Sequence, residues 1–90
     1  MSSMVTVASM DRLVIDPHAP EPSYRQLADQ LRARIRSGQI APREALPSIT
    51  FMQQETGLAV NTIRKAIDIL VEEQLVVTVP GRGTYVTGPG

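Results

Sequence analysis

The sequence predicts an α+β fold, in which a three-helix core is followed by a C-terminal β-hairpin. Two segments, around residues 24–35 and 63–71, repeat apolar residues at helical spacing. A shorter segment between them is bounded by Ser48 and Gly57, which are typical residues for the start and the end of a helix. After Gln74 the pattern changes to β-branched residues on both sides of a glycine-rich turn. The 90 residues suffice for one small domain with a single core.

The first helix is expected to begin with Ser23 as its N-cap. Gln26, three residues later, completes a capping-box pattern, and Gly38 predicts a left-handed C-cap. Asp29 lies three residues before Arg32, which predicts a weak ion pair on the helix surface. The apolar residues that share one face of this helix are Tyr24, Leu27, Ala28, Leu31 and Ile35.

The second and third helices are separated by a tight turn at Gly57. Ser48 is the expected N-cap of the second helix, and only half of one face of that helix is apolar. The third helix has the strongest periodicity in the chain. Its apolar face is made by Ile63, Ala66, Ile67, Leu70 and Val71. Two helices joined in this way predict a helix-turn-helix.

A β-hairpin is expected after the third helix. Its strands are predicted at Leu75–Val79 and Thr84–Thr87, on either side of a turn at Pro80–Gly83. The residues predicted to form one core are Leu27, Leu31, Ile35, Leu46, Ile63, Ile67, Leu70, Val77 and Val86. Three helices and a hairpin in this order predict a winged helix-turn-helix, with the hairpin as the wing.

The termini are expected to lie outside this unit. Residues 1–12 show no helical period and predict a flexible tail. Leu13–Ile15 is a short apolar run that predicts either a strand or an extended lead-in. The domain is therefore expected to span residues 13–87, and residues 88–90 are interpreted as a frayed end or the start of a linker.

Composition excludes several classes of function. The chain has no cysteine and one histidine, so neither a disulfide nor a thiolate or histidine metal site is expected. The sequence contains no nucleophile paired with a base and no phosphate-binding loop, so we expect neither an enzyme nor a cofactor. No apolar run is long enough for a membrane helix, and the N-terminus lacks the pattern of a signal peptide, so a cytoplasmic location is expected. Nine basic and nine acidic residues balance, which by itself indicates no nucleic-acid partner.

From Pro22 to Val86 the chain resembles the DNA-binding domain of the GntR family of bacterial transcription regulators. The motifs that carry the resemblance are Leu46-Pro47-Ser48, Gly57, Asn61-Thr62-Ile63-Arg64-Lys65-Ala66, Leu70-Val71-Glu72-Glu73 and Pro80-Gly81-Arg82-Gly83-Thr84. The resemblance implies a regulator, and specifically a repressor, that binds double-stranded DNA in a sequence-specific way. Family members usually carry a larger C-terminal domain that binds ligand and dimerises. The chain is thus either a stand-alone short form or the DNA-binding domain of a longer regulator.

The resemblance also implies which residues contact DNA. The exposed N-terminal residues of the third helix would reach base edges in the major groove. At the wing tip, glycines would let Arg82 approach the DNA backbone closely. The positions implied as DNA-binding are Ser48, Thr50, Asn61, Thr62, Arg64, Lys65, Arg82, Gly83 and Thr84.

The sequence departs from the family pattern at several positions that face DNA. Thr50, Val60 and Thr78 stand where the family tends to carry arginine or another base, and Ala59 replaces a capping hydroxyl. Gln74 replaces the usual glycine before the wing. Three fewer phosphate contacts predict weak binding with a shallow salt dependence.

These departures leave a second interpretation open, in which the fold is kept as a protein-interaction module that has lost most DNA affinity. Its contact surface would be formed by Ile49, Phe51, Val60 and Val79. Arg64 and Lys65 would then be solvated, or paired with Asp68. Phe51 is expected either to be partly buried or to contact a protein or a thymine methyl group.

The expected partners are double-stranded DNA and a second copy of the chain. Operators for helix-turn-helix proteins are commonly palindromic, so we expect a monomer or weak homodimer that is strengthened on DNA. Pairing of the Leu13–Ile15 edges is an alternative route to a dimer. Neither a membrane nor a small-molecule effector is expected to bind these residues.

Overall fold

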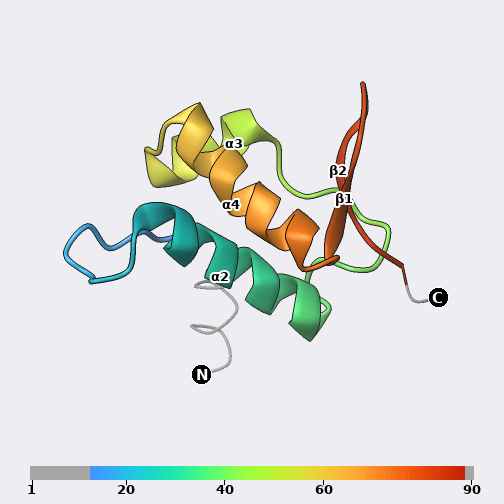
Figure 1. The fold of residues 1–90 in the computed structure, drawn as a ribbon, viewed down its shortest axis with the longest axis horizontal. Helices are drawn as coiled ribbons and strands as arrows, with labels where there is room; N and C mark the ends of the chain where they lie inside the picture. The colour runs from blue at the N-terminus through green and yellow to red at the C-terminus, as the bar shows by residue number, and fades with distance from the viewer. Residues whose placement is uncertain (1–12, 89–90) are drawn as a thin grey trace, which may run out of the picture.

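The computed structural model describes residues 13–88, which form three helices and a two-stranded antiparallel sheet (Figure 1). The elements are α2 (Ser23–Ser37), α3 (Ile49–Thr56), α4 (Val60–Glu72), β1 (Val76–Val79) and β2 (Gly83–Val86). α2 and α4 pack along each other, α3 lies against α4, and the hairpin projects from the C-terminal end of α4. The predicted fold class, a winged helix-turn-helix, is confirmed. The tail predicted at residues 1–12 lies outside the described residues, as do residues 89–90.

The predicted capping box of α2 is wrong. The helix begins at Ser23, but Pro22 is the N-cap residue and no side chain caps the helix. Gln26 instead binds the preceding chain: its amide oxygen accepts from the Asp16 N–H at 2.8 Å, and its amide nitrogen donates to the Asp16 carbonyl at 2.9 Å. The predicted left-handed cap at Gly38 is confirmed, with φ of 86°.

The segment before α2 is an extended lead-in rather than a strand. Gln30 binds Val14 in the same way that Gln26 binds Asp16. Its amide oxygen accepts from the Val14 N–H at 3.0 Å, and its amide nitrogen donates to the Val14 carbonyl at 2.6 Å. Leu13 is only 2% exposed and completes the core. Because Val14 and Asp16 already use their backbone groups, that side of the segment has nothing left for pairing with a second copy.

The helix-turn-helix caps agree with the sequence. Ser48 accepts a hydrogen bond from the Phe51 N–H at 3.1 Å, as an N-cap of α3 should. Gly57 ends α3 with φ of 74°, which glycine adopts without strain. Thr56 tightens the turn, since its hydroxyl donates to the Met52 carbonyl at 2.6 Å. The relative directions of α3 and α4 are set by this turn.

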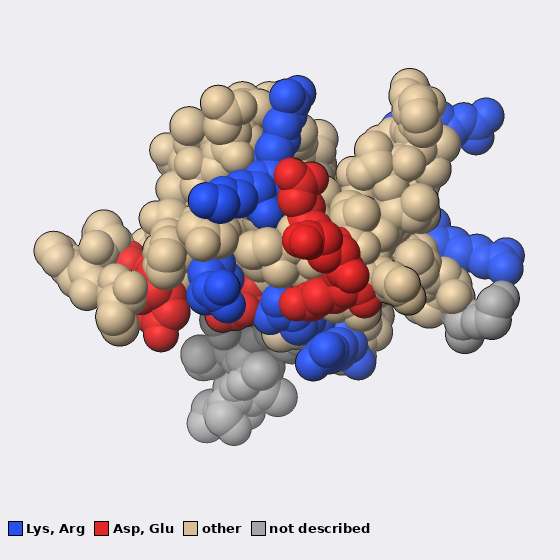
Figure 2. Space-filling view, in the orientation of Figure 1, with Lys and Arg blue, Asp and Glu red and all other residues tan. Residues whose placement is uncertain are grey.

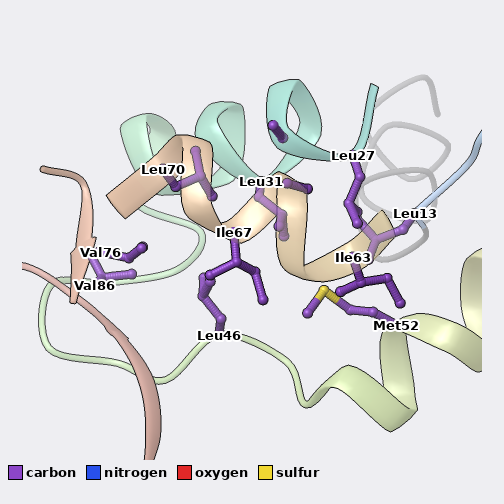
Figure 3. Packing of buried hydrophobic residues seen from close by; sticks show 12 residues of the cluster. Leu13, Leu27, Leu31, Leu46, Met52, Ile63, Ile67, Leu70, Val76 and Val86 are labelled. Carbon is purple, nitrogen blue, oxygen red and sulfur yellow. The ribbon is translucent and has the colours of Figure 1, made fainter. Parts of the chain in front are cut away.

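The core lies between the three helices and the base of the hairpin (Figure 3). Its buried members are Leu13, Leu27, Ala28, Leu31, Leu46, Met52, Ile63, Ala66, Ile67, Leu70, Val76 and Val86. The predicted core position of Val77 is wrong, because Val77 is 47% exposed; Val71, predicted on the apolar face of the third helix, is 38% exposed. Val76 takes the place of Val77, because Val76 pairs with Val86 on the buried face and side chains alternate along a strand. Ile35 is half-buried against the core.

The base of the wing is held by the connection between α2 and α3. The Arg43 N–H donates to the Val86 carbonyl at 2.9 Å, and the Val86 N–H donates to the Glu44 carbonyl at 2.8 Å. The Leu46 N–H donates to the Thr84 carbonyl at 2.8 Å, next to a bridge between Ala45 and Tyr85. β2 is therefore paired on both edges, which holds the hairpin in a defined direction relative to the helices.

An ion pair joins α2 to the end of α4. Arg32 binds both carboxylate oxygens of Glu73, at 2.7 Å through Nε and 2.8 Å through Nη2. It also binds Asp29 at 2.6 Å, which confirms the predicted pair within α2. The hydrogen bonds from Arg32 hold the pKa of Glu73 below its usual value. The sequence did not predict the contact with Glu73, because the partners lie 41 residues apart.

Candidate nucleic-acid interface

The first turn of α4 presents polar groups that have no partner within the described residues. Ala59 is the N-cap residue and provides no side-chain hydrogen bond, as expected for the loss of a hydroxyl. Asn61 and Arg64 are exposed and Thr62 is half-buried. In residues 13–88 their side chains make no hydrogen bond or ion pair, so they do not act as local caps. The positive end of the helix dipole and these side chains are thus available to an anionic partner.

A groove of about 540 Å³ separates α4 from the wing. Arg64 and Asp68 line it from α4, and Thr78, Arg82 and Thr84 line it from the hairpin. A neighbouring hollow of about 450 Å³ continues toward the start of α3 and shares the wing residues. The two hollows bring together six of the nine predicted site residues, namely Ser48, Thr50, Arg64, Arg82, Gly83 and Thr84.

Lys65 lies apart from this groove. Its ammonium nitrogen is 4.2 Å from the centre of the Tyr24 ring, a cation–π contact that directs the side chain toward α2. Within the described residues, neither Arg64 nor Lys65 forms an ion pair with Asp68. The interpretation that these bases are neutralised by Asp68 is therefore wrong.

The backbone at the wing tip adopts the conformations expected from its glycines. Gly81 has φ of 75° and Gly83 has φ of 131°, both in the region that favours glycine. Arg82 lies between them and is exposed, and its N–H closes the turn on the Val79 carbonyl at 3.0 Å. A backbone or phosphate can approach this tip without meeting a Cβ atom of either glycine.

The equal numbers of basic and acidic residues are distributed unevenly over the surface. Figure 2 shows acidic side chains in a band over the middle of this face, with basic side chains around the band and on the wing. On α4 itself the basic residues precede the acidic ones, since Arg64 and Lys65 are followed by Asp68 and Glu72. The N-terminal half of α4 therefore carries the positive charge.

The contact surface of the alternative interaction module is small. Of its four apolar residues only Phe51 is exposed, at 44%, and Ile49, Val60 and Val79 are half-buried. A single exposed aromatic side chain is ordinary for a small domain and does not make an apolar docking patch.

Residues 23–86 match the family model described as bacterial regulatory proteins, gntR family. The chain belongs to the gntR family. Among curated gntR relatives, the mannosyl-D-glycerate transport/metabolism system repressor MngR of Escherichia coli is 42% identical over 66 residues, 73% of this chain and 28% of MngR. The transcriptional repressor NagR of Bacillus subtilis is 36% identical over 75 residues, 83% of this chain and 31% of NagR. These relatives are transcription regulators and not enzymes.

Solved gntR structures have the same fold. YtrA from Sulfolobus acidocaldarius superimposes with a TM-score of 0.78 at 33% identity, over 87% of this chain and 82% of that one. The DNA-binding domain of AraR in complex with operator ORX1 superimposes with a TM-score of 0.78 at 32% identity, over 84% of this chain and 96% of that one. The chain spans less than a third of the length of the MngR and NagR repressors.

Sequence reasoning missed one groove residue of the opposite charge, Asp68. Its position four residues after Arg64, on the same face of a helix, was the signal that could have found it.

Among residues 13–88, no helix has both the length and the apolar character needed to cross a bilayer.

Proposed function

We propose that this chain binds double-stranded DNA in a sequence-specific way as a transcription repressor, either as a stand-alone short form or as the DNA-binding domain of a longer regulator. The observation that carries the proposal is the match to AraR domains solved on operator DNA, with α4 and the wing tip lining one groove. In the cytoplasm of a bacterium, a protein bound across a promoter blocks polymerase by occupying the site, and no catalytic group is needed. We take residues 13–87 as the unit that binds.

In the proposed complex α4 lies in the major groove, and the exposed residues of its N-terminal half face the base edges. Arg64 offers a bidentate donor pair that suits the O6 and N7 acceptors of guanine. Asn61 and Thr62 reach bases or phosphates from the same turn. Arg82 contacts the backbone from the wing tip, where Gly83 permits close approach.

The start of α3 supplies the remaining contacts. Ser48 already accepts from the Phe51 N–H, and its hydroxyl proton stays free to donate to a phosphate. Thr50 and Thr84 line the same hollow and add hydroxyl donors. Lys65 stays over Tyr24 and contributes charge near the duplex rather than a base contact.

The test of the proposal is selection of the full chain against a randomised duplex pool at low salt, followed by gel shifts with the selected sequence. Enrichment of one sequence, and preference for it over a scrambled duplex, is the expected result. Absence of any enrichment at low salt would overturn the proposal and leave the interaction module as the better explanation.

The proposed oligomeric state is a monomer or weak dimer that pairs on a palindromic site. Sedimentation of the free chain and of the chain with the selected duplex measures it. We expect a monomer in the absence of DNA and two copies of the chain on each duplex. A tight dimer of the free chain at nanomolar concentration would contradict this. We assign no effector ligand to these residues.

A further inference from the structure

Asp68 is an unpaired acidic side chain inside the groove that the proposed function assigns to DNA. It lines this groove together with Arg64 and Arg82. The side chain is exposed, and within the described residues its carboxylate forms no hydrogen bond or ion pair. A carboxylate in this position repels the phosphates of a duplex. A hydrogen bond from another part of the DNA would offset this repulsion.

The chemistry of the duplex restricts what that contact can be. An ionised carboxylate only accepts hydrogen bonds, and phosphate oxygens do the same. The donors that bases offer in the major groove are the N4 amino group of cytosine and the N6 amino group of adenine. Adenine presents its N7 acceptor beside the amino group, and this lone pair repels a carboxylate, whereas cytosine presents the donor alone. Cytosine is thus the base that fits.

The position of Asp68 on α4 allows this contact together with that of Arg64. The two residues are four apart, so they lie on the same face about 6 Å apart along the helix axis. That rise corresponds to about two base pairs of duplex. We propose that Asp68 is a specificity-determining residue, which accepts a hydrogen bond from the N4 amino group of a cytosine about two base pairs from the base that Arg64 contacts. The inference rests on the proposed function.

Glu72 is a matched control for Asp68. It carries the same charge one turn further along the same exposed face of α4, but it does not line the groove. Of these two α4 carboxylates, one therefore lines the groove and the other does not. A long-range effect of charge changes with either substitution, whereas base recognition changes only with Asp68.

The test is selection from a randomised duplex pool by the full chain and by its Asp68→Ala, Asp68→Asn and Glu72→Gln variants. The wild type and Glu72→Gln are expected to enrich the same sequence, with cytosine at one position. Asp68→Ala should lose the enrichment at that position only. Asp68→Asn should change it to adenine, because an asparagine amide pairs with N6 and N7 of that base. Exchange of the cytosine pair in the selected duplex should weaken the wild type about tenfold and Asp68→Ala by no more than about twofold.

Two results would overturn the proposal. If the Asp68 variants select the wild-type sequence, or bind every duplex more tightly with unchanged preference, Asp68 acts through charge repulsion alone. If the wild type enriches nothing, the proposed function fails, and the role of Asp68 falls with it. The first result leaves DNA binding intact, so the two failures are distinguishable.

Discussion

Gln74 adopts a left-handed backbone conformation, with φ of 62°, at the turn from α4 into β1. Its N–H donates to the Val71 carbonyl at 2.9 Å, and its carbonyl accepts from the Thr87 hydroxyl at 3.0 Å. Glycine, usual at this position in the family that the sequence resembles, has no Cβ atom to resist this conformation. The departure in sequence thus places a strained residue at this turn.

Gln74→Gly is expected to raise the free energy of unfolding by roughly 0.5–1 kcal/mol. Relief of the left-handed strain exceeds the entropy that a glycine adds to the unfolded chain. Urea denaturation measures the difference. Gln74→Ala keeps the Cβ atom and should show no such gain, and a destabilised Gln74→Gly would refute the interpretation of strain.

Leu70 is fully buried between α2 and the hairpin, with 0% of its surface exposed. Leu70→Ala should lower the free energy of unfolding by about 2–5 kcal/mol, because it removes buried methyl groups and leaves a cavity. Val71→Ala, at a neighbouring position that is 38% exposed, should cost much less. Chemical denaturation of both variants measures the two losses of unfolding free energy. Equal losses would contradict the observation that Leu70, and not Val71, lies on the buried face of α4.

Among the elements, α2 is joined to the C-terminal end of α4 by the ion pair between Arg32 and Glu73. The pKa of Glu73 is lower in the folded chain than in the unfolded one, so its stabilising effect is present above its ordinary pKa of 4.5. That effect is lost as the pH falls through the lower folded-state pKa. Glu73→Gln should therefore melt at a lower temperature than the wild type at pH 7, and the two should converge at acidic pH.

Thermal unfolding at pH 7 and at pH 3 measures this convergence. Glu72→Gln removes the same charge from a residue with no ion pair among the described residues, and should not reproduce the effect. A constant difference between Glu73→Gln and the wild type at all pH values would show that the ion pair is not responsible.

The helices could be predicted from sequence because their caps and periods are local. Ser48 begins α3, and Gly57 and Gly38 end α3 and α2, as expected. The capping box at Ser23 failed because Gln26 is recruited by the lead-in, a contact between segments that no local pattern contains. The buried face of β1 was displaced by one residue because a continuous run of β-branched residues does not specify which face is buried.

For the molecule as a whole, the site is built from segments that only the fold brings together. Six of the nine predicted residues line adjoining hollows between α3, α4 and the wing, as the order of elements suggested, whereas Asn61, Thr62 and Lys65 do not line them. The position of Lys65 over Tyr24 and the pairing of residues 43–46 with β2 could not be predicted, because both depend on tertiary packing.

Restoration of a base at the start of α4 should strengthen DNA binding. Val60→Arg is expected to raise affinity for the selected duplex and to steepen the slope of log affinity against log salt by about 0.9. Val14→Arg adds the same charge to the lead-in, where Val14 is 64% exposed, and should change the slope far less. A salt titration of both variants measures the slopes, and equal slopes would mean that the start of α4 does not face DNA.

The position of α4 in the major groove is tested most directly by the affinity of Arg64→Ala for the selected duplex and for a scrambled one, at moderate salt. Loss of a base contact should remove about 1–3 kcal/mol of preference for the selected sequence. Arg25→Ala removes an exposed arginine of α2 outside the groove and should leave that preference unchanged. If Arg64→Ala binds the selected duplex with wild-type affinity and preference, α4 does not lie in the major groove.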